Sequence, residues 1–235
     1  MNLYESFADH YDAVFPAEKL TAVFLIGAFS ESPILDLGCA TGGYALALAS
    51  KGFVVEGIDL DARMIAIAGA KKAVGSGNVL FRVGDIRDLA AKNAYGGIYC
   101  IGNTLVHLAD EETISEMIQK MFAALKPGGT TVVQIVNYDR ILAAKVTSLP
   151  TIRNDGREFF RRYRLEGGRI VFATVLTCRN EHYEAETTLV PLTSAGLVAA
   201  FTGAGFRSIE TFGGFDLRPY DLMHSFSLIL KAVKP

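Results

Sequence analysis

The sequence predicts an α/β fold in which a doubly wound, seven-stranded sheet is preceded by N-terminal helices and interrupted by an inserted antiparallel β flap. Between residues 32 and 136, short apolar runs alternate with longer helical patterns, which is typical of a parallel sheet with crossover helices. After residue 150 the apolar period changes to two, which indicates antiparallel strands. The chain has 235 residues, 50% of them hydrophobic, which is enough for one large core. We therefore expect a single domain over residues 1–235, with a helical cap over residues 1–30 and the flap over residues 150–192.

Two helices are expected before the sheet. Tyr4, Phe7, Tyr11 and Val14 are spaced at i, i+3, i+7 and i+10. A first short helix should therefore carry an aromatic stripe on one face. A second helix is expected over residues 17–29.

The parallel unit comes next, and its clearest element is the helix predicted over residues 110–126. Its apolar residues recur at helical spacing, and Asp110 can cap its first turn. The sequence Lys126-Pro127-Gly128-Gly129 is predicted to end it. The strands of the unit are expected at residues 33–37, 53–59, 79–83, 97–102 and 130–136, and its other helices at residues 43–51 and 61–74.

Three runs after residue 150 predict the strands of the flap, joined by turns at residues 166–168 and 179–181. A helix and two strands then complete the seven-stranded sheet, and its last strand is expected to run antiparallel. The flap strands are expected at residues 157–165, 169–177 and 182–190, the helix at 194–204, and the final strands at 206–212 and 224–231.

A glycine-rich loop runs from the first strand directly into a helix. In a doubly wound sheet such a turn lies at the carboxyl end of a strand, where ligands bind. Glycine allows the sharp turn and a close approach of the ligand to the backbone. The spacing Gly38-x-Ala40-x-x-Gly43 nearly fits a dinucleotide fingerprint, so the loop alone leaves NAD and S-adenosylmethionine both open.

Acidic residues end three successive strands. Asp59 can accept hydrogen bonds from both ribose hydroxyls, as it can in an NAD enzyme, and Asp85 can accept the amine of an adenine. Asp36 beside the loop suits a ligand with a cationic amino group and a sulfonium better than a pyrophosphate. Each Asp taken singly can also be a cap or turn residue, but three such residues together favour S-adenosylmethionine.

The segments DLGCATGG, EGIDLD, VGDIRDL, YCIGNTLVHL and LKPGG, in this order and spacing, resemble the motifs of class I S-adenosylmethionine-dependent methyltransferases. The resemblance covers most of the chain and implies a Rossmann-like fold. It also implies that Gly38, Ala40 and Gly42 hold the methionine part of the cofactor. By the same resemblance, Asp59 holds the ribose, and Asp85 and Ile86 hold the adenine. The full set of expected cofactor-binding residues is Tyr11, Asp36, Gly38, Cys39, Ala40, Gly42, Asp59, Leu60, Met64, Asp85, Ile86 and Ile101.

Two further segments, CIGNTLVHL and NYDRIL, resemble the glycine and sarcosine N-methyltransferase branch of that family. Where that branch carries an arginine that can clamp the amino-acid carboxylate, this sequence has Val136, which argues against glycine as the substrate.

Methyl transfer from a sulfonium is an in-line displacement, so positioning of the acceptor matters more than a strong base. We expect catalytic roles for His107, Asn103 and Tyr138, with His107 as the candidate base and Tyr4 and Tyr11 beside the acceptor. The alternative is a structural role for each: a hydrogen-bonding His107, Asn103 in a turn, and tyrosines that only pack. An amine, a hydroxyl or a thiol would each serve as acceptor.

The flap carries a run of arginines that predicts either an anion clamp or a solvated strand face. These residues are Arg153, Arg157, Arg161, Arg162 and Arg164.

Composition narrows the other function classes. Lys and Arg number 23 against 25 Asp and Glu, which argues against a nucleic-acid partner. The three cysteines show no metal-ligand spacing, so we expect no metal and a reducing, cytoplasmic environment. The acidic N-terminus does not read as a secretory signal, and no apolar run is long enough to span a membrane.

Three alternatives to a small-molecule methyltransferase stay open at this point. One is a non-catalytic module that binds S-adenosylmethionine, and a second is an NAD-dependent oxidoreductase. The third, a nucleic-acid methyltransferase, would normally carry an Asp/Asn-Pro-Pro-aromatic or Pro-Cys segment after the fourth strand, where this chain has Gly102-Asn103-Thr104-Leu105. The sequence does not reveal the oligomeric state, and a homo-oligomer is compatible with it.

Overall fold

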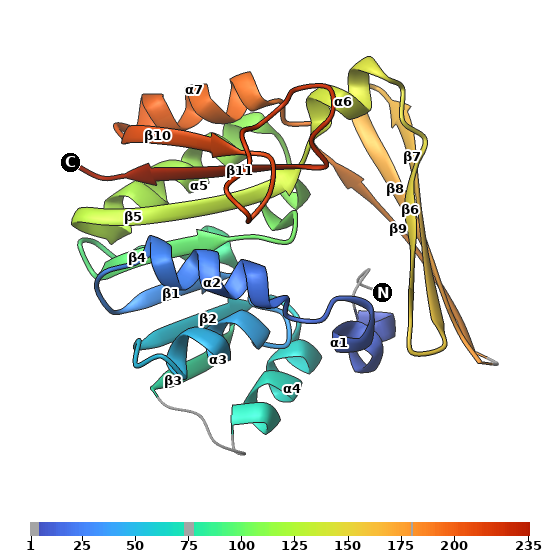
Figure 1. The fold of residues 1–235 in the computed structure, drawn as a ribbon, viewed down its shortest axis with the longest axis horizontal. Coiled ribbons are helices and arrows are strands. Elements are labelled where there is room, and N and C mark those ends of the chain that lie inside the picture. The colour runs from blue at the N-terminus through green and yellow to red at the C-terminus, as the bar shows by residue number, and fades with distance from the viewer. Residues whose placement is uncertain (1–4, 73–77, 180) are drawn as a thin grey trace.

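Two β-sheets with helices around the larger one make up the computed structural model, which describes residues 5–72, 78–179 and 181–235 (Figure 1). The larger sheet has seven strands in the order β10-β11-β5-β4-β1-β2-β3, and the smaller has four in the order β6-β7-β8-β9. The strands of the larger sheet are β1 (Ile34–Leu37), β2 (Val55–Asp59), β3 (Val79–Val83), β4 (Tyr95–Cys100), β5 (Leu125–Val136), β10 (Arg207–Phe212) and β11 (Ser227–Val233).

The pairing of the larger sheet confirms the predicted doubly wound topology. β1 pairs in parallel with β2 and β4, β2 with β3, and β4 with β5, whereas β11 is antiparallel to both of its neighbours. Leu37 lies opposite Ile58, and Asp59 lies opposite Val83. The loops that follow these three strands therefore begin at the same edge of the sheet.

Helices cover both faces of this sheet and bury a separate apolar cluster on each. One cluster joins side chains of α5 and α7 to Leu35 and Leu37, and the other joins α2 and α3 to Ile34. Alternate residues of β1 thus face opposite cores. The helices are α1 (Tyr11–Val14), α2 (Lys19–Ala28), α3 (Gly43–Ala49), α4 (Ala62–Lys72), α5 (Glu111–Ala124), α6 (Tyr138–Ala143) and α7 (Ser194–Ala204), and the short 3-10 helices are η1 (Glu5–His10), η2 (Ile86–Asp88) and η3 (Thr104–His107).

The structure differs from the prediction where α5 meets β5. The expected helix over residues 110–126 ends at Ala124, and the strand expected from residue 130 already begins at Leu125. Leu125 pairs with Tyr95, and the amide of Gly128 donates to the carbonyl of Lys234. The Lys-Pro-Gly-Gly segment therefore lies within β5, where sheet partners satisfy its backbone.

The expected N-terminal helix is observed as η1 followed by α1, and Phe7, with a non-helical φ of −128°, introduces a kink within η1. Its apolar stripe nevertheless has the predicted role, since Phe7 and Val14 are buried against Phe159 and Leu176 of the smaller sheet. Tyr4 lies outside the described residues, as do the last residues of the helix expected over residues 61–74.

The flap has four strands where the sequence predicted three. The additional strand, β6, lies at the edge of the smaller sheet and contains Pro150. Its apolar pattern is weak, because an edge strand with a proline lacks a clear alternation. The strands of the flap are β6 (Ser148–Asn154), β7 (Arg157–Glu166), β8 (Arg169–Cys178) and β9 (Glu181–Leu189).

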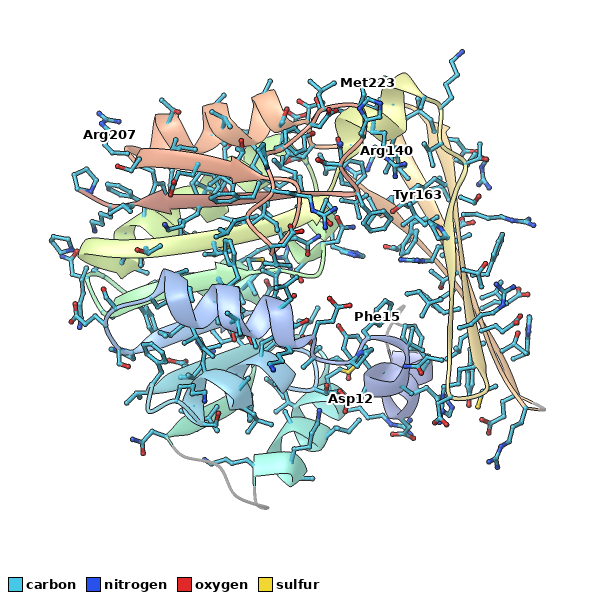
Figure 2. The ribbon with its side chains drawn as sticks, viewed as in Figure 1. Asp12, Phe15, Arg140, Tyr163, Arg207 and Met223 are labelled. Carbon is cyan, nitrogen blue, oxygen red and sulfur yellow. The ribbon has the colours of Figure 1, made fainter. Side chains whose placement is uncertain are left out.

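The flap stands beyond the carboxyl ends of the parallel strands and is attached at two places (Figure 1). Tyr163 and Phe172 belong to the apolar cluster of the main sheet, with ring centroids 5.4 Å apart. Phe159 instead packs on the N-terminal segment, 5.5 Å from the ring of Phe7 and 5.3 Å from that of Phe15. Figure 2 shows Phe15 and Tyr163 on the side of the flap that faces the main body.

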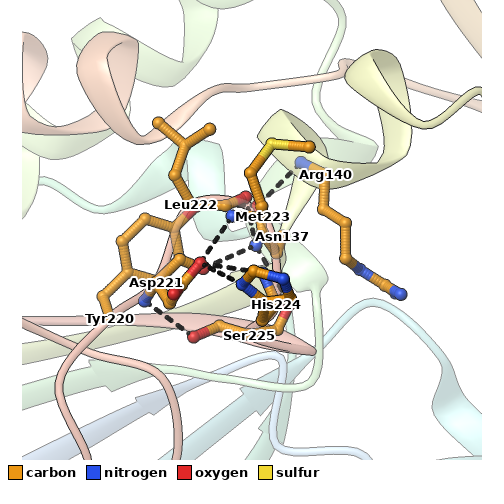
Figure 3. Close-up of polar contacts among 8 residues, drawn as sticks. All are labelled: Asn137, Arg140, Tyr220, Asp221, Leu222, Met223, His224 and Ser225. Atoms are coloured by element: carbon orange, nitrogen blue, oxygen red, sulfur yellow. Dashed lines mark hydrogen bonds and ion pairs between the residues drawn. The ribbon is translucent and has the colours of Figure 1, made fainter.

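Asn137 fixes the loop between β10 and β11 to the carboxyl end of β5 (Figure 3). Its side chain is fully buried, and its Oδ1 accepts from the Tyr220 hydroxyl at 2.7 Å and from the Arg140 amide at 3.1 Å. Its Nδ2 lies within 3.0 to 3.3 Å of the carbonyls of Asp221, Leu222 and Ser225. One amide side chain therefore contacts five backbone and side-chain groups.

No helix within residues 5–72, 78–179 and 181–235 combines the length and the apolar character needed to cross a membrane.

Replacing Asn137 by Ala should lower the free energy of unfolding by about 2 to 3 kcal/mol, because buried partners of the amide lose their hydrogen bonds. Urea unfolding followed by circular dichroism measures this loss. Gln119→Ala on the exposed face of α5 is the matched control, and it should change stability by no more than about 0.5 kcal/mol. Equal unfolding midpoints for the two variants would contradict the role given to Asn137.

Candidate functional site

The glycine-rich loop leaves β1 at Leu37 and enters α3 at Gly43 through residues with positive φ. Gly38 has a φ of 78° and Gly42, the residue that caps α3, has a φ of 77°. A Cβ atom on Gly38 would lie 2.6 Å from the side chain of Thr104. A larger residue at Gly38 is therefore excluded both by the backbone conformation and by the neighbouring η3.

The Asp59 carboxylate at the end of β2 holds this loop in place. Its Oδ2 accepts from the amide of Ala40 at 2.8 Å, and its Oδ1 accepts from the amide of Asp61 at 2.9 Å. Burial raises the pKa of Asp59, while these backbone donors and that of Leu60 lower it. The carboxylate keeps further lone pairs for a ligand, since each oxygen can accept more than one hydrogen bond.

Asp85 follows β3 on the same side and caps η2. Its Oδ1 accepts from the amide of Arg87 at 2.8 Å, and its Oδ2 lies 2.9 Å from Nε of the same residue. These hydrogen bonds from Arg87 lower the pKa of Asp85, although partial burial opposes them. Asp85 is therefore ionised at neutral pH and can accept from a ligand donor.

A cavity of about 390 Å³ lies between these loops, and both Asp59 and Asp85 are on its wall. Of the residues expected at the site, it is lined by Tyr11, Gly38, Ala40, Asp59, Leu60, Met64, Asp85, Ile86 and His107. Seven other residues complete the wall: Asp61, Gly84, Arg87, Gly102, Thr104, Leu108 and Ala109. Most of these flank a predicted residue in the sequence, so the quoted motifs already contained the signal for them.

Asp36 lies behind the loop and does not line this cavity. Its side chain is buried and accepts from the hydroxyl of Tyr99 at 2.8 Å. Burial raises the pKa of Asp36 to about 8; the Tyr99 hydrogen bond lowers it, and the charge of Asp59 raises it further. Its predicted contact with the cofactor stays a prediction.

Three further residues expected at the cofactor also lie off the cavity wall. The Cys39 thiol is directed to the carbonyl of Ala40, at 3.7 Å. A Cβ atom on Gly42 would lie 2.4 Å from the ring of Phe81, so this glycine allows close packing against β3. Ile101 is buried in the apolar cluster that includes α2 and α3. Their predicted cofactor contacts are likewise untested by this geometry.

His107 ends η3 and reaches the cavity wall. Burial lowers the pKa of its imidazole to about 4. The ring is therefore neutral at physiological pH and a weaker base than an exposed histidine.

Asn103 and Tyr138 contact each other away from the cavity wall. Asn103 Nδ2 lies 3.0 Å from the Tyr138 hydroxyl, and Asn103 Oδ1 accepts from the amide of Val136 at 2.9 Å. Asn103 also has a φ of 70°, which suits its position in a turn. These contacts connect the ends of β4 and β5, and the catalytic roles predicted for both residues remain predictions.

A second cavity, of about 440 Å³, lies where the N-terminal segment meets the flap. There the ligand atoms of His10, Cys178 and Glu181 lie within 4.8 Å of one another, a grouping that the sequence spacing did not reveal. Arg157 Nε lies 3.2 Å from His10 Nδ1, and the guanidinium also pairs with Asp155. This cation disfavours a metal ion in the cluster.

Residues 34–129 match the family model described as a methyltransferase domain. This stretch is therefore similar to methyltransferase domains. It contains the glycine-rich loop, Asp59, Asp85 and η3, and these supply most of the cavity wall. The family resemblance that the motifs predicted is thereby confirmed.

Known proteins extend this similarity over the rest of the chain. A putative methyltransferase of Bacillus subtilis is 30% identical over 131 residues, which cover 54% of this chain and 53% of that protein. The chain thus spans about half the length of this relative. A glycine/sarcosine N-methyltransferase of Halorhodospira halochloris is 27% identical over 203 residues, covering 77% of this chain and 68% of that protein. The crystal structure of an S-adenosylmethionine-dependent methyltransferase from Clostridium acetobutylicum superposes with a TM-score of 0.83 at 16% identity, covering 99% of both chains. The methyltransferase domain and its flap therefore share the fold of that enzyme.

The contribution of Asp36 to the free energy of unfolding should fall as the pH rises from about 4 to about 8, because folded Asp36 keeps a proton that the unfolded chain releases. The slope contributed by one such group is about 1.4 kcal/mol per pH unit within this window. Asp36→Asn keeps the acceptor for Tyr99 and removes the titration. The free energy of unfolding of Asp36→Asn, measured by urea unfolding at pH 5, 6 and 7, should therefore rise with pH relative to that of the wild type.

The control for this experiment is Asp216→Asn. Arg218 lowers the pKa of the exposed Asp216, so Asp216 does not make the free energy of unfolding fall as the pH rises. Parallel wild-type and Asp36→Asn curves would mean that Asp36 is already ionised in the folded protein.

The imidazole of His107 should stay neutral down to about pH 5, because burial lowers its pKa to about 4. An NMR titration of the histidine C–H signals, with the His107 signal assigned from its absence in His107→Gln, measures this directly. A His107 signal with a midpoint between pH 6 and 7 would show that the ring is solvated.

Proposed function

We propose that this protein transfers the methyl group of S-adenosylmethionine to an amine nitrogen of a small molecule. The observation that carries the proposal is the common cavity of Asp59 and Asp85, with the backbone of Gly38 and Ala40 on the same wall. The register of β1, β2 and β3 brings these groups to one edge of the sheet. An NAD site requires a place for a pyrophosphate, and a pair of carboxylates beside the loop opposes that charge.

The chemistry of the cavity wall fits a sulfonium nucleoside. S-adenosylmethionine supplies an activated methyl group and carries a positive charge, which suits a cavity with the carboxylates of Asp59, Asp61 and Asp85. We assign the ribose to Asp59, the adenine to Asp85 and Ile86, and the methionine part to Gly38 and Ala40. Leu60, Met64 and Tyr11 add apolar surface to the same wall.

The acceptor assignment follows from the bases that the cavity wall offers. His107 is a weak base with a pKa of about 4, and Asp59 and Asp85 are engaged by backbone or arginine donors. An amine that is neutral in the bound state needs no base before the displacement, whereas a weakly acidic hydroxyl does. Orientation of the acceptor can then supply about 7 to 11 kcal/mol of the barrier. The similarity to a glycine/sarcosine N-methyltransferase supports nitrogen as the acceptor atom.

The remaining expectations are part of the same proposal. The partner is a small molecule, with no nucleic acid, and the compartment is a reducing, cytoplasmic one because all three cysteines are free and buried. A non-catalytic S-adenosylmethionine-binding module differs from this proposal only in turnover. A screen of amines, amino acids, phenols and thiols with labelled cofactor distinguishes the two, and methylation of phenols alone would overturn the amine assignment.

Asp59→Ala and Asp85→Ala should each weaken the binding of S-adenosylmethionine and S-adenosylhomocysteine by about 10- to 100-fold, the loss expected for one hydrogen bond to a charged group. Isothermal titration calorimetry measures the dissociation constants. Asp216→Ala, which removes an exposed carboxylate paired with Arg218, should bind as the wild type does. Binding of NAD without binding of either sulfur nucleoside would refute the cofactor assignment.

A further inference from the structure

Arg140 lies on α6, directly beyond the carboxyl end of β5, and its charge has no acidic partner. Within residues 5–72, 78–179 and 181–235, no carboxylate oxygen lies within 4.0 Å of its guanidinium, and its buried Nε has no hydrogen-bond acceptor. Its neighbour Asp139 is engaged by the amide of Ser194 and the hydroxyl of Tyr220. A partly buried cation without a counterion is costly, so a ligand anion would be stabilising here.

The orientation of Arg140 separates it from the structural network around Asn137. Its amide donates to Asn137, but Figure 3 shows its side chain extending away from the loop between β10 and β11. The guanidinium carbon lies 5.9 Å from the ring centroid of Phe226, which leaves its polar edge available. The hydrogen bonds of Asn137 therefore involve the backbone of Arg140 and not its charged side chain.

The flap contributes a second cation and a hydroxyl to the same place. Arg161 and Tyr163 are two residues apart on β7 and so point to one face of the flap. Both Arg140 and Arg161 lower the pKa of Tyr163, whereas burial raises it to about 12, so the phenol keeps its proton and can donate. Figure 2 shows the Arg140 and Tyr163 side chains next to each other, between α6 and the flap.

The other arginines of the flap have different surroundings. Arg153, Arg157 and Arg164 pair with Glu158, Asp155 and Glu166, respectively. Arg162 points to the opposite face of β7, where it lies 5.0 Å from the ring of Phe160. Arg161 is thus the arginine of this run that faces α6.

This cluster lies on the same edge of the sheet as the cofactor cavity. α6 follows Val136, whose amide donates to Asn103, and η3 begins at the next residue. Thr104 and His107 of η3 then line the cavity. The cations therefore lie beyond the end of β5, next to the strand β4 that leads into the cavity wall.

We propose that Arg140, Arg161 and the Tyr163 hydroxyl bind an oxyanion of the methyl acceptor, either a carboxylate or a phosphate. This inference rests on the proposed function, because it names the substrate class of the same site: an amine that carries an anionic group. Two guanidinium groups from opposite elements suit such a group: Arg140 can donate two parallel hydrogen bonds, and Arg161 can add a donor although its Nη2 already donates to the carbonyl of Pro150 at 2.6 Å.

NMR titration of the protein saturated with S-adenosylhomocysteine tests the site, with inorganic phosphate and acetate as separate probes. The Nε–H signals of Arg140 and Arg161, identified by their absence in the variants, should shift with at least one probe. Arg140→Met keeps the apolar stem against Phe226 and should weaken that binding about tenfold, as should Arg161→Met. The stronger probe indicates whether the acceptor carries a carboxylate or a phosphate.

Arg207→Met is the matched control, because Arg207 is an exposed arginine on β10 at the far end of the molecule (Figure 2). It should bind both probes as the wild type does. If neither probe shifts the two signals, or if Arg140→Met binds as tightly as the wild type, the inference is overturned. Binding of S-adenosylhomocysteine is measured on the same sample, so that the two proposals are tested separately. If S-adenosylhomocysteine does not bind, the cofactor assignment is refuted. The anion site is then tested by titrating the free protein with phosphate and acetate.

Discussion

The contact between the Asp59 carboxylate and the Ala40 amide is the constraint on which the cavity depends. It joins the glycine-rich loop after β1 to the residue that ends β2, at 2.8 Å. The parallel register places these two ends side by side, and the neighbouring β3 ends at Val83, one residue before Gly84. A wall built from three strand ends thus needs no long side chain to reach across the sheet. Its geometry is set by the backbone, which the two cores hold from both faces.

A second layer of polar groups supports this wall from inside the protein. Asp36 and Tyr99 form a buried hydrogen bond beneath the loop, and Asn103 and Tyr138 form another between β4 and β5. Buried polar pairs of this kind are stabilising when each member is satisfied, and they define the positions of the strand ends. Acidic, amide and phenol side chains, which are common in catalytic sites, therefore also have a structural role in this protein.

The sequence allowed most of the sheet to be predicted, because each parallel strand is a short apolar run bounded by clear turn residues. β3 and α7 agree with their predicted bounds. β6 was missed because an edge strand with a proline has little periodicity, and the start of β5 was misplaced because Lys-Pro-Gly-Gly is typical of a helix end. For the site, residues adjacent to strand ends were predictable from spacing. The separation of Asn103 and Tyr138 from the cavity was not, because it depends on side-chain direction, and neither was the meeting of Arg140 with Arg161, because they lie on different elements.

The aromatic packing of the N-terminal segment connects the flap to the wall of the cofactor cavity. Phe159 on the flap contacts Phe15 at 5.3 Å, Phe15 contacts Tyr11 at 5.2 Å, and Tyr11 is on the wall of the cofactor cavity. A row of tilted and edge-on ring contacts therefore connects the flap to the cavity wall without passing through the main sheet. The position of the Tyr11 ring on the cavity wall therefore depends on the packing of Phe15 against β7.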